Sequence, residues 1–209
     1  MAIARVLAWG TLGLLYRVRS LDSRYVPAEG PVILAANHGS YLDPFFLAMP
    51  VGRNFCFMAK AEVFRRFSWR LLAALGAFPV RRGAQDEETF ATAEAVLARG
   101  GGVVVFPDGG IYRGGEIGVR PKPGVGRLAL LSGAPVVPAA IRGSRAVGRL
   151  RLPRVEVVYG VPLRFSREAE DSWDRHQLVA DTIYAEIRRL YGERSVGIRK
   201  PASGPEGFA

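Results

Sequence analysis

The residues best suited to chemistry lie in one short segment, where His38 and Asp43 are five positions apart. His38, one of two histidines in the chain, comes one residue after residues 32–36, an apolar run that is typical of a buried strand. A histidine at the end of such a strand lies at the edge of the core, where a substrate reaches it. Asp43 is then able to bond one ring nitrogen, which leaves the other nitrogen to act as a base. The alternative is a structural histidine that caps a helix or satisfies a hydrogen bond of the core.

Polar residues also follow two other apolar runs that are typical of strands. Arg82 follows one of them and Asp108 follows the other. The loops that follow strands in an α/β sheet gather at one edge and form the site. We therefore expect His38, Arg82 and Asp108 to converge, although Arg82 has an alternative role as a charge at the sheet edge.

The elements that position these residues alternate between strands and helices. Strands are expected at residues 32–36, 54–58, 78–81, 103–106, 136–141 and 154–159, and helices at residues 44–48, 61–75, 87–98, 125–131 and 173–191. With 209 residues and 49% apolar content, the chain is large enough to bury a proper core. The alternation predicts a single α/β domain whose mixed, mostly parallel central sheet is flanked by helices.

Neither a metal nor a bound cofactor is expected. The single cysteine, Cys56, excludes an internal disulfide and a cysteine-rich metal site, and it indicates a reducing compartment. Cys56 lies in an apolar run, so we expect it to be buried and unreactive. The second histidine, His176, has polar sequence neighbours on the last predicted helix, and we expect it on the surface.

The N-terminal residues 1–16 are apolar apart from Arg5, and Arg17 and Arg19 follow them. The run is shorter than the roughly 20 residues that cross a bilayer, and it lacks a convincing signal-peptide cleavage site. Its composition is typical of an apolar helix that lies in the membrane interface with basic residues on lipid phosphates. A terminal helix packed on the domain's own core is the alternative.

The net charge of +10 also favours an anionic membrane surface as a partner. Only three of the 29 basic residues are lysines, so an arginine-rich coding bias is another explanation. Nucleic acid is the less favoured partner, because the chain shows no recognisable nucleic-acid-binding module.

Four segments in order resemble the glycerolipid acyltransferase family, whose type member is lysophosphatidate acyltransferase. Asn37-His38 with Asp43 five residues beyond the histidine resembles the N-H-x-x-x-x-D signature. Residues 76–82 (G-A-F-P-V-R-R), 103–109 (V-V-V-F-P-D-G) and 134–138 (A-P-V-V-P) resemble the second, third and fourth blocks. Four blocks in family order, over about residues 30 to 160, are far more specific than one. The third block departs from the common F-P-E-G-T-R-S, because Asp108 replaces the glutamate and the nearest arginine, Arg113, comes two positions late.

The resemblance implies transfer of a fatty acyl group from acyl-CoA or acyl carrier protein to the free hydroxyl of lysophosphatidate, which gives phosphatidate. It implies that His38 is the general base and that Asp43 orients it. Such a donor is already a reactive thioester, which agrees with the lack of a G-x-S-x-G nucleophile motif. The substrate-binding residues that it implies are Asn37, Arg82, Asp108, Gly109, Arg113 and Lys122.

The resemblance also suggests individual roles. It favours Arg82 as the ligand of the head-group phosphate, since a guanidinium pairs with phosphate through two hydrogen bonds. Lys122 is a second phosphate candidate at the start of a predicted helix, and a solvated loop lysine is its alternative. Asn37 or backbone N–H groups near Gly39 are expected to stabilise the tetrahedral oxyanion.

Three segments are expected along the chain: a membrane-interface segment over residues 1–24, an acyltransferase domain over residues 25–191 and a flexible tail over residues 192–209. The expected location is the cytoplasmic face of the cell membrane, as a peripheral or monotopic protein. A lipid-binding relative with little activity, an acyltransferase for another lysophospholipid and a basic nucleic-acid-binding protein are the alternatives.

Overall fold

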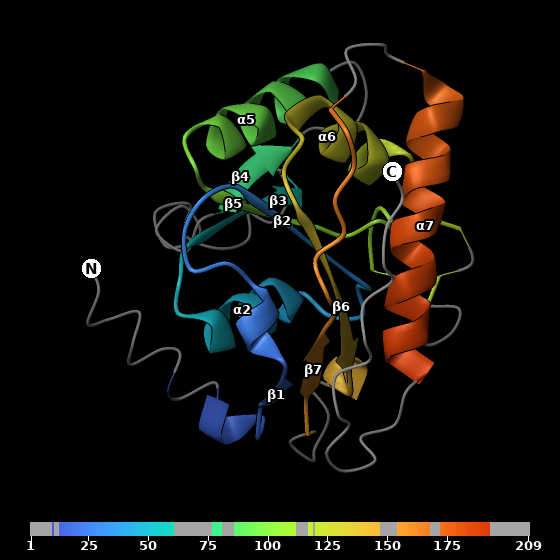
Figure 1. Cartoon of the computed structure of the whole chain (residues 1–209). Coiled ribbons are helices and arrows are strands. Elements are labelled where there is room, and N and C mark those ends of the chain that lie inside the picture. Colours follow the sequence, from blue (N-terminus) through green and yellow to red (C-terminus); the bar gives the residue numbers. More distant parts are fainter. Residues whose placement is uncertain are drawn as a thin grey trace.

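The structure is a computed structural model that describes residues 10, 13–60, 77–80, 86–111, 117–118, 120–146, 154–167 and 172–192. Its centre is a seven-stranded sheet in the order β1-β7-β6-β2-β5-β3-β4 (Figure 1). The strands are β1 (Arg19–Leu21), β2 (Val32–Ala36), β3 (Phe55–Lys60), β4 (Ala77–Val80), β5 (Gly102–Val105), β6 (Val136–Arg142) and β7 (Glu156–Tyr159). Every neighbouring pair is parallel except β6 with β7, which confirms the mixed, mostly parallel sheet.

The middle strands are buried on both faces. Every residue of β2 and β5 is buried, and in the register Ile33 lies between Val103 of β5 and Val136 of β6. Continuous apolar runs of this kind are what covered parallel strands require. The pleat sends alternate side chains to opposite faces, so Ile33 and Ala35 join one core cluster while Leu34 joins the other.

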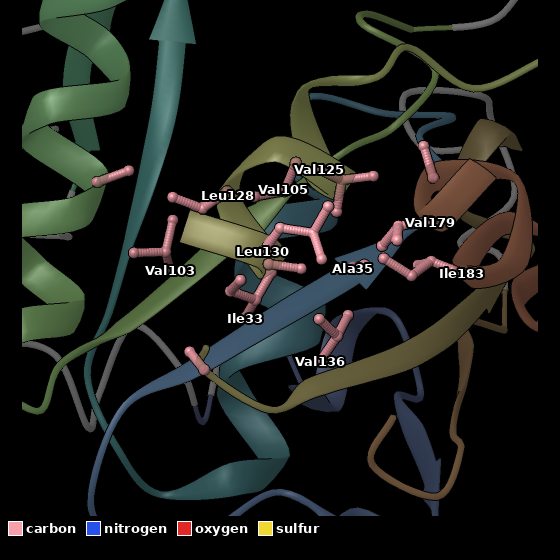
Figure 2. Packing of buried hydrophobic residues seen from close by; sticks show 14 of the residues in the cluster. Ile33, Ala35, Val103, Val105, Val125, Leu128, Leu130, Val136, Val179 and Ile183 are labelled. Carbon is pink, nitrogen blue, oxygen red and sulfur yellow. The ribbon is translucent and has the colours of Figure 1, made fainter. Parts of the chain in front are cut away.

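Helices cover the two faces unequally. The helices α5 (Asp86–Ala98), α6 (Gly124–Ser132) and α7 (Trp173–Gly192) pack on one face, and the short α2 (Asp43–Ala48) packs on the other (Figure 1). Figure 2 shows the cluster under these three helices, in which Val125 and Leu128 of α6 and Val179 and Ile183 of α7 gather around Ile33 and Ala35 of β2. Short 3-10 helices occur at Ser23–Tyr25, Met49–Val51 and Ser144–Ala146.

The predicted elements that fall on described residues are confirmed to within about two residues at each end. The structure adds β1, which the sequence analysis missed and which pairs in parallel with β7 at the sheet edge. The predicted helix over residues 61–75 lies outside the described residues, as do residues 1–9. None of the helices within the described ranges combines the length and the apolar character needed to cross a bilayer.

The prediction that His176 is a surface residue is wrong. His176 is 4% exposed and lies on the buried face of α7. Its neighbours in space are the residues three, four and seven positions on, Val179, Ala180 and Ile183, which are all buried. Of its polar neighbours in sequence, Asp174 and Arg175 are exposed, but Gln177 is buried as His176 is, so polar neighbours did not indicate a surface position.

Candidate active site

The loop after β2 is tied to the neighbouring strand by Asn37. The Asn37 side chain is buried, and its Nδ2 donates to the Ile141 carbonyl at 2.9 Å while its Oδ1 accepts the Ile141 N–H at 2.8 Å. Both polar groups of this amide are therefore used inside the fold. The contact of Asn37 with substrate stays a prediction, and this pair of bonds gives the residue a structural task at the start of the loop.

His38 and Asp43 meet as their spacing predicts. The distance from His38 Nδ1 to Asp43 Oδ2 is 3.0 Å, and the Asp43 side chain is fully buried. The same oxygen accepts the N–H groups of Gly39 at 2.6 Å and Ser40 at 2.7 Å, so the loop backbone fixes the carboxylate. Because an ionised carboxylate only accepts hydrogen bonds, this contact favours the tautomer with the proton on Nδ1 and the lone pair on Nε2.

The His38 ring is held on its face as well as on its edge. It stacks on Phe106, which follows β5, with ring centroids 4.0 Å apart and planes inclined by 16°. The His38 side chain is 15% exposed, so it is packed but open to the surface. Asp43 and Phe106 together therefore restrain the orientation of the His38 ring.

Asp108 binds the backbone of the loop that carries His38, residues 37–42, which is called the catalytic loop below because of the role proposed for it. Its Oδ2 accepts the His38 N–H at 3.1 Å, and its Oδ1 accepts the hydroxyl of Tyr184. Burial, followed by the hydrogen bond and charge of Asp108, raises the pKa of Tyr184 well above its usual value. The structure thus confirms that Asp108 and His38 converge, and it adds Tyr184, which the sequence analysis missed. The only signal was its place on the buried face of α7, which is typical of an ordinary core residue.

Lys122 lies beside the loop that carries Asp108. The Lys122 N–H donates to the Pro107 carbonyl at 2.9 Å, and its exposed side chain lies along Gly109. A Cβ built on Gly109 would be 2.9 Å from Lys122 Nζ, and Gly109 has a φ of +70°. Glycine is therefore favoured at position 109 by both its backbone conformation and the close lysine. Arg82, the predicted phosphate ligand, and Arg113, another predicted substrate-binding residue, lie outside the described residues.

A cavity of about 390 Å³ adjoins the start of the catalytic loop, at Asn37 and Gly39. It lies where β2 and β6 end, and its lining includes Asn37, Gly39, Ser144, Arg145 and Tyr191. The described ranges contain no group of three His, Cys, Asp or Glu side chains placed to hold a metal ion. Cys56 is only partly buried, and this burial raises the pKa of its thiol.

Comparison with known sequences decides the family. The profile of the Acyltransferase family matches residues 17–142, which include His38, Asp43 and Asp108. The chain belongs to the acyltransferase family. The match ends at Arg142, so α7 and the Tyr184 hydroxyl that reaches Asp108 come from the part of this acyltransferase beyond the family profile.

Two curated relatives and one solved structure are similar to this acyltransferase. A probable 1-acyl-sn-glycerol-3-phosphate acyltransferase of Mycoplasma genitalium is 27% identical over 61% of the chain, and the match spans 50% of that relative's length. A protein of the same name from Mycoplasma pneumoniae is 25% identical over 85% of the chain and 72% of the relative. The crystal structure of the 1-acyl-sn-glycerophosphate (LPA) acyltransferase PlsC from Thermotoga maritima superposes with a TM-score of 0.65 at 19% identity, over 93% of this chain and 84% of that one. At that identity the superposition shows a shared fold.

Proposed function

We propose that the chain transfers a fatty acyl group from a thioester donor, acyl-CoA or acyl carrier protein, to the free hydroxyl of lysophosphatidate. Membership of the acyltransferase family and the names of the two mycoplasmal relatives support this activity. The observation that carries the proposal is the 3.0 Å contact between His38 Nδ1 and the buried carboxylate of Asp43. This contact leaves Nε2 as a base at the end of a rigid strand.

The chemistry then needs one proton shuttle. His38 Nε2 takes the proton of the acceptor hydroxyl as its oxygen attacks the thioester carbonyl, and a C–O bond forms. The tetrahedral intermediate collapses, the C–S bond breaks, and the leaving thiolate takes the proton from the imidazolium. Asp43 stabilises that imidazolium and keeps the ring in the productive tautomer. No cofactor enters this scheme.

The donors that were expected to stabilise the oxyanion have hydrogen-bond partners within the protein. The Asn37 amide bonds Ile141, and the Gly39 and Ser40 N–H groups point at Asp43. These donors are engaged within the protein, so the expected oxyanion contacts of Asn37 and Gly39 would require the loop to give up bonds that hold the base. We therefore place more weight on the base itself than on an oxyanion hole in the His38 loop.

Lys122 supports a phosphate-bearing acceptor. Its ammonium lies against Gly109, next to the residue that holds the His38 backbone, and the whole chain carries a net charge of +10. We propose that Lys122 binds the acceptor phosphate together with Arg82 and Arg113. An ammonium and two guanidinium groups suit a phosphate monoester better than a zwitterionic head group.

We also propose that the protein works at the anionic, cytoplasmic face of the cell membrane. Leu14 and Leu15 are 83% and 48% exposed, and Tyr41 of the catalytic loop is 64% exposed. Tyr16 packs edge-on against Phe46 of α2 with centroids 5.5 Å apart, so this apolar segment rests on the helix that begins at Asp43. Exposed apolar side chains and basic charge are the two signals that hold a peripheral protein on anionic lipid.

The membrane proposal is tested without removing β1. We expect Leu14→Ser with Leu15→Ser to reduce pelleting with anionic vesicles, because it removes apolar contacts and leaves the sheet intact. Leu178→Ser on α7, which removes a leucine of 57% exposure from a different element, is the matched control. Equal vesicle binding by both variants would show that residues 14 and 15 do not form the membrane-binding surface.

The activity is tested with purified protein, labelled acyl-CoA or acyl carrier protein, and a panel of lysophospholipids. We expect a phosphatidate product from lysophosphatidate and little product from acceptors with zwitterionic head groups. Lipid binding without transfer from either donor would instead identify a lipid-binding relative. A salt-dependent shift of DNA or RNA without lipid binding would identify a nucleic-acid-binding protein.

A further inference from the structure

Tyr184 connects a distant helix to the catalytic loop. It lies in the middle of α7, it is 2% exposed, and its hydroxyl donates to Asp108 Oδ1. The two residues are 76 positions apart in the sequence, so only the folded sheet brings them together. Tyr184 is therefore linked to the catalytic centre by a side-chain contact and not by its place in the chain.

Asp108 passes this contact on to His38. Its second oxygen, Oδ2, accepts the backbone N–H of His38 at 3.1 Å. One oxygen of the Asp108 carboxylate is thus bonded by Tyr184 of α7. The other oxygen is bonded by the backbone of His38, whose imidazole is the proposed base. Loss of the Tyr184 hydroxyl would leave Asp108 free to rotate about its side-chain torsion and release that N–H.

The space around these groups is filled. A Cβ built on Gly118 would be 2.2 Å from Asp108 Oδ1 and 2.9 Å from the Tyr184 hydroxyl oxygen. Arg188, one turn further along α7, lies over the Tyr184 ring at 5.2 Å and donates to the Gly118 carbonyl at 2.8 Å. Gly118 thus lies close to both the phenol and the carboxylate, and Arg188 holds the Tyr184 ring and the Gly118 carbonyl.

We propose that Tyr184 is a positioning residue of the acyl-transfer site, which acts through Asp108 on the backbone of His38. The inference rests on the proposed function and adds a residue beyond the part of the chain that the family profile covers. Asp108 is one methylene shorter than the glutamate of the common third block, and a donor from α7 holds the oxygen that the shorter side chain presents. Because its pKa is raised, the phenol keeps its proton and remains a donor.

The direct test is Tyr184→Phe, which removes one hydroxyl and keeps the ring. We expect kcat to fall about 10-fold with the KM of both substrates nearly unchanged, because the base is misplaced while the substrate contacts remain. Tyr159→Phe is the matched control, since this buried hydroxyl donates to the Leu47 carbonyl at 2.7 Å. It should lower thermal stability at least as much as Tyr184→Phe and leave kcat unchanged.

A second readout does not depend on activity. Amide hydrogen exchange at His38 should be slow in the native protein and at least several-fold faster in Tyr184→Phe, while Tyr159→Phe leaves it unchanged. If no thioester donor supports acyl transfer but His38 exchange still responds to Tyr184→Phe, the proposed function fails and the positioning contact stands. If transfer is robust and neither kcat nor His38 exchange responds, the positioning inference is overturned and the function stands.

A double variant tests the link through Asp108. Asp108→Glu lengthens the side chain toward the Tyr184 hydroxyl and should reduce kcat in the native background. Combined with Tyr184→Phe, which removes that hydroxyl, the longer carboxylate has room, so the double variant should be more active than the product of the single effects predicts. Strictly multiplicative effects would show that the two residues act independently and would contradict the proposal.

Discussion

The two histidines of this chain occupy opposite kinds of environment, although both are largely buried. The His38 side chain is 15% exposed and His176 is 4% exposed, so burial alone hardly separates them. His38 ends a strand, bonds a fixed carboxylate at 3.0 Å and stacks on Phe106. His176 lies on the buried face of α7, where α6 packs against this helix. Its backbone N–H donates to the Ser172 carbonyl at 3.0 Å.

This difference shows that the possible role of a histidine depends on the secondary-structure element that carries it. At the end of β2 the chain leaves the sheet, so the ring is supported from one side and open on the other. On the buried face of a helix the ring is enclosed by residues three, four and seven positions away. The catalytic proposal for His38 and the structural interpretation of His176 both follow from these positions, and each is open to experiment.

The largest expected effect separates the two histidines by activity. His38→Ala should lower kcat roughly 100- to 10,000-fold, because the reaction loses its general base. His176→Ala should lower the melting temperature and leave kcat of the folded protein close to native. Steady-state rates and thermal melts of the two purified variants check both statements. Comparable losses of kcat in the two variants, measured at equal folded fractions, would show that the two histidines do not differ in their role in catalysis.

Asp43→Asn should be nearly as damaging to kcat as His38→Ala. The amide has the size of the carboxylate but carries no charge to stabilise the imidazolium, and with its NH₂ group toward Nδ1 it favours the unproductive tautomer. Kinetics at saturating acceptor and donor isolate this loss from binding. A variant with native kcat would show that Asp43 only supports the loop through the Gly39 and Ser40 N–H groups.

A smaller effect is expected from the predicted phosphate ligand Arg82. Arg82→Ala should raise the KM for lysophosphatidate about 10-fold and change kcat little, because a phosphate contact mostly supplies uniform binding. Arg82→Lys should recover only part of the loss, since an ammonium cannot make the paired contact. An acceptor without a phosphate is the control, and its KM and kcat should be the same for the native and the variant protein. An unchanged KM for lysophosphatidate would remove Arg82 from the site.

The smallest effect on activity is expected where the second histidine packs. A Cβ on Gly126 would be 2.0 Å from the His176 carbonyl oxygen, so Gly126→Ala forces α6 and α7 apart. We expect a loss of about 1–3 kcal/mol in the free energy of unfolding, typical of overpacking, with kcat of the folded protein retained. Gly192→Ala, where nothing lies within 4 Å of the added Cβ, is the matched control and should be near neutral.

Much of the fold could be predicted because its elements carry local signals. The apolar runs of β2, β5 and β6 and the apolar spacing of Val179, Ile183 and Ile187 on α7 indicated their structure directly. β1 gave no such signal, because three residues with two exposed side chains show no apolar pattern. Its pairing with β7 is set by strands that are distant in sequence.

The candidate site was predictable in part for the same reason. The contact of His38 with Asp43 depends on a five-residue spacing within one loop, which the sequence displays. The contact of Asp108 with Tyr184 depends on how α7 crosses the sheet, and a tyrosine on an apolar helix face is normally a core residue. His176 was misjudged because sequence neighbours were taken for spatial neighbours, a mistake that helical periodicity corrects.

The most direct test of the account is the tautomer of His38, which the presence of only two histidines makes measurable. In protein labelled with ¹⁵N-histidine, long-range proton–nitrogen correlation spectra distinguish a proton on Nδ1 from one on Nε2, and His38→Ala assigns the signals. Neutral His38 should carry its proton on Nδ1 in the native protein and lose that preference in Asp43→Asn, while the His176 signals stay in place. A native His38 with its proton on Nε2 would leave no base facing the acceptor hydroxyl and would contradict the mechanism.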